Sequence, residues 1–231
     1  MVSIRKRIAS ALQFNPSRVR LEGWAAAAGR LGSDPSFIVL DAGAGRAPYR
    51  HHFSAVTYET ADFLGFGEQY GYAQTTYECD LAAIPVEDGR FDLVFCSQTL
   101  EHVPDPCAVL REFRRIVKPC GQVWISVPFF YAEHDAPYDF YRYTQYGLRY
   151  MAASAGFAVR SIEPLEGYYA TLSYQLQIAS RQLSAAWLPL RAFFAVLSVT
   201  FGRLELSRPR RDVGICKNYC CVLTPSAAAD G

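Results

Sequence analysis

The chain has 231 residues, a formal net charge of +1 and a hydrophobic fraction of 51%. This length is enough for one large α/β domain with a full core, and two full domains are not expected. The nearly balanced charge excludes a protein whose overall field is tuned to nucleic acid. A small or locally recognised substrate fits this composition better.

The cysteines and the N-terminal residues bear on the compartment. Seven scattered cysteines match neither a disulfide framework nor paired C-x-x-C zinc ligands. The basic start Arg5-Lys6-Arg7 precedes an apolar run of only residues 8–14, without a convincing cleavage site. We therefore expect free thiols and a cytoplasmic protein.

The first predicted elements are a helix and a buried strand. Asn15-Pro16 has the cap and first-turn residues of a helix start, and the Ala-rich stretch to Arg30 is amphipathic. We assign it to a helical extension covering residues 1–31. The apolar run Phe37–Leu40 has the pattern of a strand buried on both faces, and it leads directly into the glycine turn of residues 41–45.

The rest of the chain alternates strands with helices. The predicted strands cover residues 55–58, 91–96, 122–127, 158–162 and 219–223. The clearest helix is Pro106–Val117, which the segment Lys118–Gly121 stops. This alternation predicts an α/β fold with a mainly parallel sheet and helices on both faces. We expect a single domain over residues 1–231, with an insertion at 164–212 and a frayed end after Pro225.

Polar and glycine residues gather where the first strands end. Gly43 and Gly45 would let a ligand approach the backbone closely, although such a pair is as often only a tight turn. Asp62 has the spacing of a carboxylate that accepts hydrogen bonds from ribose hydroxyls, with Glu59 as the alternative in a shifted register. Asp80 could face an adenine amino group, or it could be a turn residue.

Five segments in this order resemble a known family. Residues 41–45, 80–85, 91–94, 100–103 and 118–121 resemble the ordered signature of the class I S-adenosylmethionine (SAM)-dependent methyltransferases, type 11 group, over roughly residues 37–160. The resemblance implies a Rossmann-like fold and SAM as cofactor. The cofactor residues it implies are Asp41, Gly43, Gly45, Asp62, Asp80, Leu81, Ser97, Gln98 and His102.

Within this assignment, Gly43 and Gly45 line the methionine part of SAM, and Asp62 takes the ribose. The adenine lies against Asp80 and Leu81, while Ser97-Gln98 and His102 border the methyl group. A nicotinamide-dependent enzyme would need a third glycine to cradle a pyrophosphate, and Ala47-Pro48 stands there instead.

The acceptor is expected at residues 128–144, which are dense in aromatic and ionisable side chains. This segment resembles the H-x-x-P-x-D-F/Y-Y-R-Y/F-T stretch of methyltransferase-like proteins associated with glycan and cell-surface biosynthesis. His134 is the candidate general base, because its ordinary pKa lies near neutrality. Tyr131, Asp139 and Arg142 are the candidate substrate contacts. Equally, His134, Asp139 and Arg142 could simply tie the loop together.

Two further regions contain residues that could bind a metal ion, a partner or a membrane. His51 and His52 have the character of solvated helix residues, and we predict no metal site. The apolar stretch Leu183–Phe201, divided by Pro189 and Arg191, is too short and broken to span a bilayer comfortably. It would form a lid helix or a homodimer contact, or, with the basic residues up to 211, touch the inner face of a membrane.

The leading hypothesis is an enzyme that transfers a methyl group from SAM to oxygen or nitrogen of a small-molecule, glycan or lipid-linked acceptor. The alternative is a methyltransferase-like partner or regulator that binds SAM without turnover. A third hypothesis is a nicotinamide-dependent oxidoreductase. Binding of NAD without binding of SAM would support it.

Overall fold

The computed structural model describes residues 15–65, 71–207 and 214–226. The chain divides into two compact units, one made of residues 1–22 and 164–218 and the other of residues 23–163 and 219–231. The predictions for residues 5–14, for the basic positions 208–211 and for the end after residue 226 lie outside the described residues. Each unit is described on its own below.

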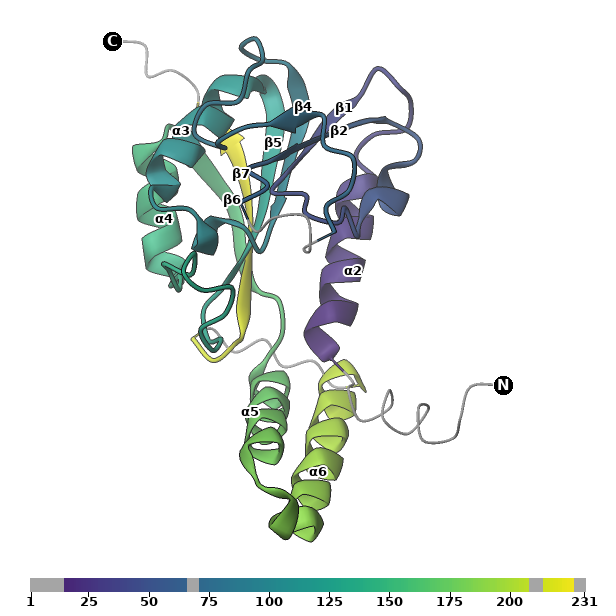
Figure 1. Cartoon of the computed structure of the whole chain (residues 1–231). Coiled ribbons are helices and arrows are strands. Elements are labelled where there is room, and N and C mark those ends of the chain that lie inside the picture. The colour runs from purple at the N-terminus through teal and green to yellow at the C-terminus, as the bar shows by residue number, and fades with distance from the viewer. Residues whose placement is uncertain (1–14, 66–70, 208–213, 227–231) are drawn as a thin grey trace. The chain divides into compact units, whose positions relative to one another are not determined.

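The larger unit is built on a seven-stranded sheet with the order β3-β2-β1-β4-β5-β7-β6 (Figure 1). Four neighbouring pairs, β1/β2, β1/β4, β2/β3 and β4/β5, are parallel. The strands are β1 (Ile38–Ala42), β2 (Thr57–Asp62), β3 (Tyr77–Glu78), β4 (Phe91–Ser97), β5 (Val117–Pro128), β6 (Phe157–Pro164) and β7 (Asn218–Pro225). The predicted mainly parallel α/β fold is confirmed.

The strand order sets where a ligand crevice forms. The chain leaves β1 toward β2 on one side and later returns to place β4 on the other side of β1. At such a switch point, the connections leave the carboxyl ends of the two strands in opposite directions and open a crevice between them. The candidate site is therefore expected beyond Ala42 and Ser97, where β1 and β4 end.

An aromatic cluster covers one face of the sheet. In helix α2 (Pro16–Gly29), the Trp24 ring lies 5.1 Å from the Phe95 ring and 5.3 Å from the Trp124 ring, measured between centroids. Phe53 packs edge-on against the same Phe95 ring. The sequence builds α2 as expected, because the Asn15 side chain accepts hydrogen bonds from the backbone N–H groups of the first turn.

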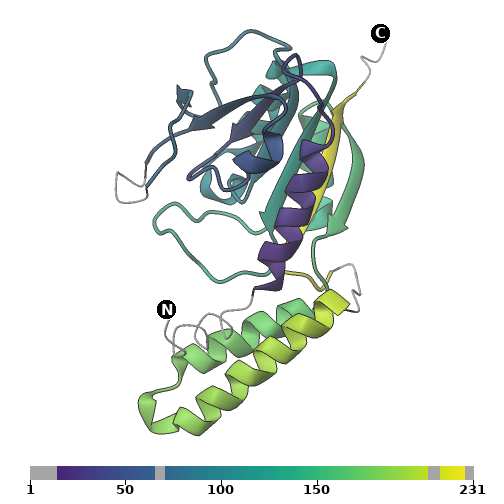
Figure 2. The same cartoon turned by 90° about the vertical axis from the view of Figure 1, so that its right-hand side faces the viewer.

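Helices α3 (Pro106–Ile116) and α4 (Gln145–Ser154) lie on the opposite side of the strands from residues 23–29 of α2 (Figures 1 and 2). The Asp105 side chain caps α3 by accepting a 2.9 Å hydrogen bond from the Ala108 N–H, and Pro106 follows it. The helix buries the apolar face that the sequence predicts, formed by Val109, Leu110, Phe113 and Ile116.

The chain turns from α3 into β5 without a separate loop. The helix ends at Ile116 and β5 begins at Val117, so the expected stop segment Lys118–Gly121 forms part of the strand. Gly121 is required there, because an added Cβ would lie 2.7 Å from the Val117 Cγ2 and 2.9 Å from the Asp92 carbonyl oxygen.

The smaller unit is dominated by two helices, α5 (Tyr168–Gln182) and α6 (Leu188–Ser207), joined through the short helix η4 (Ala185–Trp187). They run side by side as an antiparallel hairpin (Figure 2). The Ser173 hydroxyl donates to the Ser198 carbonyl at 2.7 Å, and the Ser198 hydroxyl donates back to the Ser173 carbonyl at 2.8 Å. These reciprocal bonds join the two buried positions.

Buried carboxylates fix the ends of this hairpin. Glu205 accepts hydrogen bonds from the Gly167 and Ala170 N–H groups at the start of α5. Glu166 accepts from the Ser17 hydroxyl and from the Asn218 side-chain amide. None of the helices in the described part of the chain has the combined length and apolarity that a bilayer-spanning segment needs.

Candidate functional site

The turn after β1 is shaped by two glycines in the left-handed region. Gly43 has φ +74° and Gly45 has φ +52°. The Gly43 N–H donates to the Ala61 carbonyl at 2.8 Å, which bends the chain back toward the end of β2. The space beside the Gly43 Cα is filled by Thr99, because an added Cβ would overlap the Thr99 side chain. The glycine is thus needed for backbone geometry and for packing.

Asp62 closes this turn from the end of β2. Its carboxylate accepts a 2.8 Å hydrogen bond from the Gly45 N–H and a 3.1 Å bond from the Leu64 N–H. The alternative residue, Glu59, points elsewhere: it pairs with Arg90 at 2.6 Å and accepts from the Tyr77 hydroxyl at 2.7 Å. Asp62 is therefore the acidic residue that the fold brings to the glycine turn.

The connection after β4 supplies the opposite wall. Gln98 adopts a φ of +55°, which is uncommon for a residue with a side chain and is found at sites held by their surroundings. His102 lies in the short helix η3 (Leu100–His102), and its Nδ1 lies 2.7 Å from the Tyr138 carbonyl oxygen. Since a carbonyl only accepts, Nδ1 carries a proton. Burial lowers the pKa of His102.

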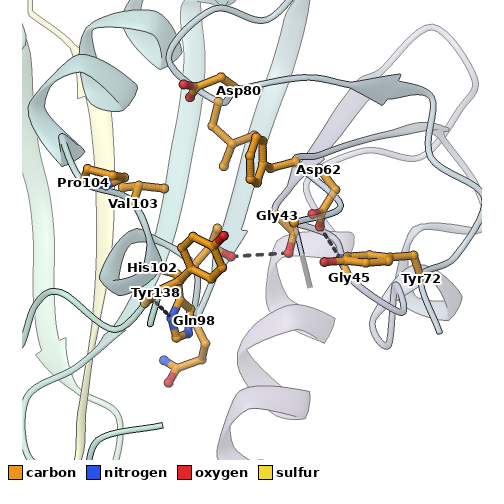
Figure 3. A pocket seen from close by; sticks show the side chains of 14 residues that line it. Gly43, Gly45, Asp62, Tyr72, Asp80, Gln98, His102, Val103, Pro104 and Tyr138 are labelled. Carbon is orange, nitrogen blue, oxygen red and sulfur yellow. Dashed lines mark hydrogen bonds between the residues drawn. The ribbon is translucent and has the colours of Figure 1, made fainter. Parts of the chain in front are cut away.

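These segments enclose a cavity of about 250 Å³. Figure 3 shows its lining side chains, with the Gly45–Asp62 bond on one side and His102 with Tyr138 on the other. The lining residues are Gly43, Gly45, Asp62, Phe63, Gly65, Tyr72, Asp80, Leu81, Gln98, Thr99, His102, Val103, Pro104 and Tyr138. Seven of the nine cofactor residues predicted from the sequence are among them.

The remaining two predicted cofactor residues lie behind this surface. Asp41 is buried in β1 and accepts a short hydrogen bond from the Tyr58 hydroxyl. Burial raises the pKa of Asp41 to about 7, although the Tyr58 bond opposes this shift. The Ser97 hydroxyl lies 2.9 Å from the Ser126 hydroxyl, within the β4/β5 pair. Both residues support the cavity from within the sheet.

Asp80 is a turn residue that also lines the cavity. Its side chain accepts a 2.9 Å hydrogen bond from the Ala82 N–H, as a turn residue would. It also lines the cavity, beside the buried Leu81. Carboxylate oxygens have several lone pairs, so the turn bond leaves acceptor capacity for a ligand.

The predicted acceptor residues form a bonded group in the loop after β5, outside the cavity lining. Arg142 binds Asp139 through two 2.7 Å hydrogen bonds, and this pairing holds the pKa of Asp139 well below its usual range. Asp139 also accepts from the His134 N–H at 2.8 Å. Arg142 donates to the Tyr131 carbonyl, and the Tyr131 ring lies 5.0 Å from the His134 ring.

His134 nevertheless contacts the cavity wall, because its ring packs against that of His102, which lines the cavity. Its centroid lies 4.9 Å from that of His102, at an edge-to-face angle of 78°. Beneath His102 lies Glu101, whose side chain is fully buried and whose pKa burial raises to about 8. His51 and His52 stack on each other at 3.9 Å in the short helix η1 (Arg50–Phe53) and do not line the cavity.

Sequence reasoning missed seven lining residues. Phe63, Gly65 and Tyr72 belong to the loop after β2, Thr99 to the connection after β4, Val103 and Pro104 to the segment after η3, and Tyr138 to the acceptor loop. Val103 and Pro104 could have been found, because Val103 is the last residue of the recognised segment at residues 100–103 and Pro104 directly follows it. No local pattern in the sequence marks Tyr72 as a lining residue.

Part of this chain matches a known protein family. Residues 40–125 match the family model described as a methyltransferase domain. The matched segment includes the ends of both β1 and β4, where the cavity lies. This match agrees with the predicted resemblance to the class I SAM-dependent methyltransferases.

Curated relatives resemble one segment of this chain. The ubiquinone biosynthesis O-methyltransferases of Azotobacter vinelandii and Pseudomonas aeruginosa are each 47% identical to it over 63 residues. That segment makes up 27% of this chain and 26% of each relative. The match therefore spans about a quarter of the relatives' length.

Several solved structures share the fold of this chain at low sequence identity. Geranyl diphosphate C-methyltransferase from Streptomyces coelicolor has a TM-score of 0.56 at 13% identity, covering 89% of this chain and 78% of that one. Phosphoethanolamine N-methyltransferase 2 from Haemonchus contortus, with bound S-adenosyl-L-methionine, has a TM-score of 0.53 at 14% identity, covering 85% and 50%. The [4+2]-cyclase SpnF scores 0.56 at 17% identity, covering 90% and 81%.

Proposed function

We propose that this protein transfers a methyl group from SAM to a hydroxyl oxygen of a small-molecule acceptor. The observation that carries the proposal is the cavity at the ends of β1 and β4, lined by Gly43, Gly45 and Asp62 within a methyltransferase domain. The curated relatives, which are named O-methyltransferases, support oxygen rather than nitrogen as the acceptor atom. Sugar-containing and lipid-linked hydroxyl acceptors fall within the same proposal.

The residues present fit SAM along the length of the cavity. Asp62 offers carboxylate lone pairs to the ribose hydroxyls while its bonds to the Gly45 and Leu64 N–H groups hold it in place. Asp80 and Leu81 would receive the adenine, and the open backbone at Gly45 the methionine part. Gln98 and His102 would then border the methyl group, on the wall opposite Asp62.

When bound, SAM supplies an electrophilic methyl group on its sulfonium. The chain's own task is then to align an acceptor oxygen with that methyl group, to exclude water and to take up the hydroxyl proton. Val103, Pro104 and Tyr138 provide apolar and aromatic surface near His102 for the acceptor. We propose that loss of His134 lowers turnover, because its ring lies beside the His102 ring at the wall of the cavity.

Calorimetric titration with SAM, S-adenosylhomocysteine and NAD tests the cofactor. We expect micromolar binding of the first two and no binding of NAD, and Asp62→Ala should weaken SAM binding because the ribose loses its acceptor. His134→Ala should keep SAM affinity and lose turnover on a panel of catechols and sugars. Binding of NAD alone would refute the proposal. SAM binding without turnover of any acceptor would favour the regulator alternative.

A second proposal concerns partners. The α5–α6 hairpin exposes Trp187, Leu188, Phe193 and Val196 to between 55% and 65%. Clustered apolar exposure of this kind marks contact surfaces. We propose that the hairpin contacts either the headgroup layer of a membrane or a second copy of the chain. Co-flotation with anionic vesicles and sedimentation velocity separate these two outcomes, and a monomer that ignores vesicles would refute both.

A further inference from the structure

Three side chains of the types that bind metal ions meet beside the cavity, and they come from two segments. Glu101 and His102 follow β4, and His134 comes from the loop after β5. Their ligand atoms, one carboxylate oxygen and two ring nitrogens, all lie within 4.8 Å of one another. The His102 Nε2 is 3.9 Å from the Glu101 Oε1. The fold therefore brings together two imidazoles and one carboxylate that the sequence separates by more than thirty residues.

The carboxylate of this group lacks the partners that a buried charge needs. Neither oxygen of Glu101 has a hydrogen-bond partner among the described residues, and its side chain is 0% exposed. The nearest cationic side chain in the loop, Arg142, already pairs with both oxygens of Asp139. A buried carboxylate normally persists where a cation or several donors compensate it. The surroundings of Glu101 are thus suited to a bound cation.

Both imidazoles are held in the orientation that metal-binding histidines adopt. The His102 Nδ1 donates to the Tyr138 carbonyl at 2.7 Å. The His134 Nδ1 lies 3.3 Å from the Ala132 carbonyl oxygen and 3.4 Å from the Asp139 Oδ2, two acceptors that favour a proton on this nitrogen. The Arg142 Nη2, a donor that favours the other tautomer, lies farther away at 3.5 Å. In neutral rings of this tautomer the lone pair is on Nε2. Metal-ligating histidines are commonly fixed in this way by a carbonyl or carboxylate on the other nitrogen.

We infer that Glu101, His102 and His134 form a binding site for a divalent transition-metal ion. Two histidines and one carboxylate suit zinc, iron or manganese, and leave coordination positions open. Ligand atoms around a tetrahedral zinc ion lie about 3.3 Å apart, so the side chains need to close by up to roughly 1.5 Å from the separations in this structure. His134 is partly exposed on its loop, which gives it room to rotate.

The position of the site suggests its use. His102 lines the cavity, and Asp135, whose Oδ2 is 3.9 Å from the His102 Nε2, offers a fourth oxygen from the solvent side. A metal ion here would hold the acceptor hydroxyl and favour its deprotonated form. This role rests on the proposed methyl transfer, whereas metal binding itself does not.

The test is titration of metal-free, tag-free protein with Zn²⁺ by calorimetry, and with Co²⁺ by visible absorption, which reports the ligand set. We expect one ion per chain, with Mg²⁺ failing to compete because it prefers oxygen ligands. Glu101→Gln and His134→Gln should each weaken Zn²⁺ binding tenfold or more. The double variant His51→Gln/His52→Gln removes the chain's other two histidines and should bind Zn²⁺ as the wild type does.

The outcomes are separable. His134→Gln changes a partly exposed side chain and should fold, so unaltered Zn²⁺ affinity in this variant overturns the site. Loss of binding in the His51/His52 variant instead would place the ion elsewhere and equally overturn it. SAM is titrated into the same samples: Zn²⁺ binding without SAM binding supports the site while refuting the methyl-transfer proposal, and the reverse result refutes the site alone.

Discussion

Gly43→Ala tests the glycine turn that forms one wall of the cavity. The residue has φ +74°, and an added Cβ would lie 2.7 Å from the Thr99 Cβ while overlapping the outer atoms of that side chain. The left-handed backbone costs a residue with a side chain about 1–2 kcal/mol, and overpacking adds about 1–3 kcal/mol. We expect a loss of about 2–5 kcal/mol in the free energy of unfolding, measured by urea denaturation.

Gly89→Ala is the matched control. Gly89 has φ +63°, but no atom lies within 4 Å of an added Cβ, so this variant reports the backbone cost alone. Gly43→Ala should therefore be the more damaging by about 1–3 kcal/mol. Introducing Thr99→Ala alongside Gly43→Ala should recover part of that difference. Equal losses in the two single variants would refute the argument that Thr99 closes the space beside Gly43.

Two further changes probe buried carboxylates. Burial raises the pKa of Asp41 to about 7, so the stability that its protonated form contributes is full below about pH 4 and is lost as the pH rises toward 7. Asp41→Asn should remove up to about 4 kcal/mol of this pH dependence in the free energy of unfolding. Urea midpoints of the variant that still change with pH between 4 and 7 as those of the wild type do would contradict this prediction. Glu205→Gln weakens the acceptor of the Gly167 and Ala170 N–H groups. The free energy of local opening at the start of α5, measured by amide hydrogen exchange, should therefore fall by about 1–3 kcal/mol, whereas exchange in β4 should not change.

The sheet could be predicted because its signals are local. The apolar run before Asp41 and the capped, amphipathic stretch from Asp105 each fix an element without reference to distant residues. The ordered segments predicted Gly43 and the spacing after the glycine turn predicted Asp62, and both residues line the cavity. The same reasoning could not separate a strand from a turn at Lys118–Gly121, because only packing against Asp92 shows why Gly121 belongs to β5.

The rest of the site depends on contacts between distant segments. Tyr72 and Tyr138 reach the cavity from loops whose paths no periodicity encodes. No metal site is predicted from the sequence, because His51 and His52 have no second cluster of ligands beside them along the chain to complete a coordination set. His102 and His134 approach each other only once the loop after β5 folds back, which its bonds to Glu101 achieve: the Phe140 and Tyr141 N–H groups both donate to the Glu101 carbonyl.

The connection between β6 and β7 has a consequence for how this protein can change over time. These strands are neighbours in the sheet, so the excursion through α5 and α6 leaves and re-enters the sheet at adjacent positions. A loop whose ends are already close loses little entropy when it grows, since the cost rises only slowly with length. Helices could therefore be lengthened, exchanged or removed at this point while β1, β4 and the cavity they form keep their register. The surface that α5 and α6 offer to other molecules can therefore change without altering the residues that line the cavity.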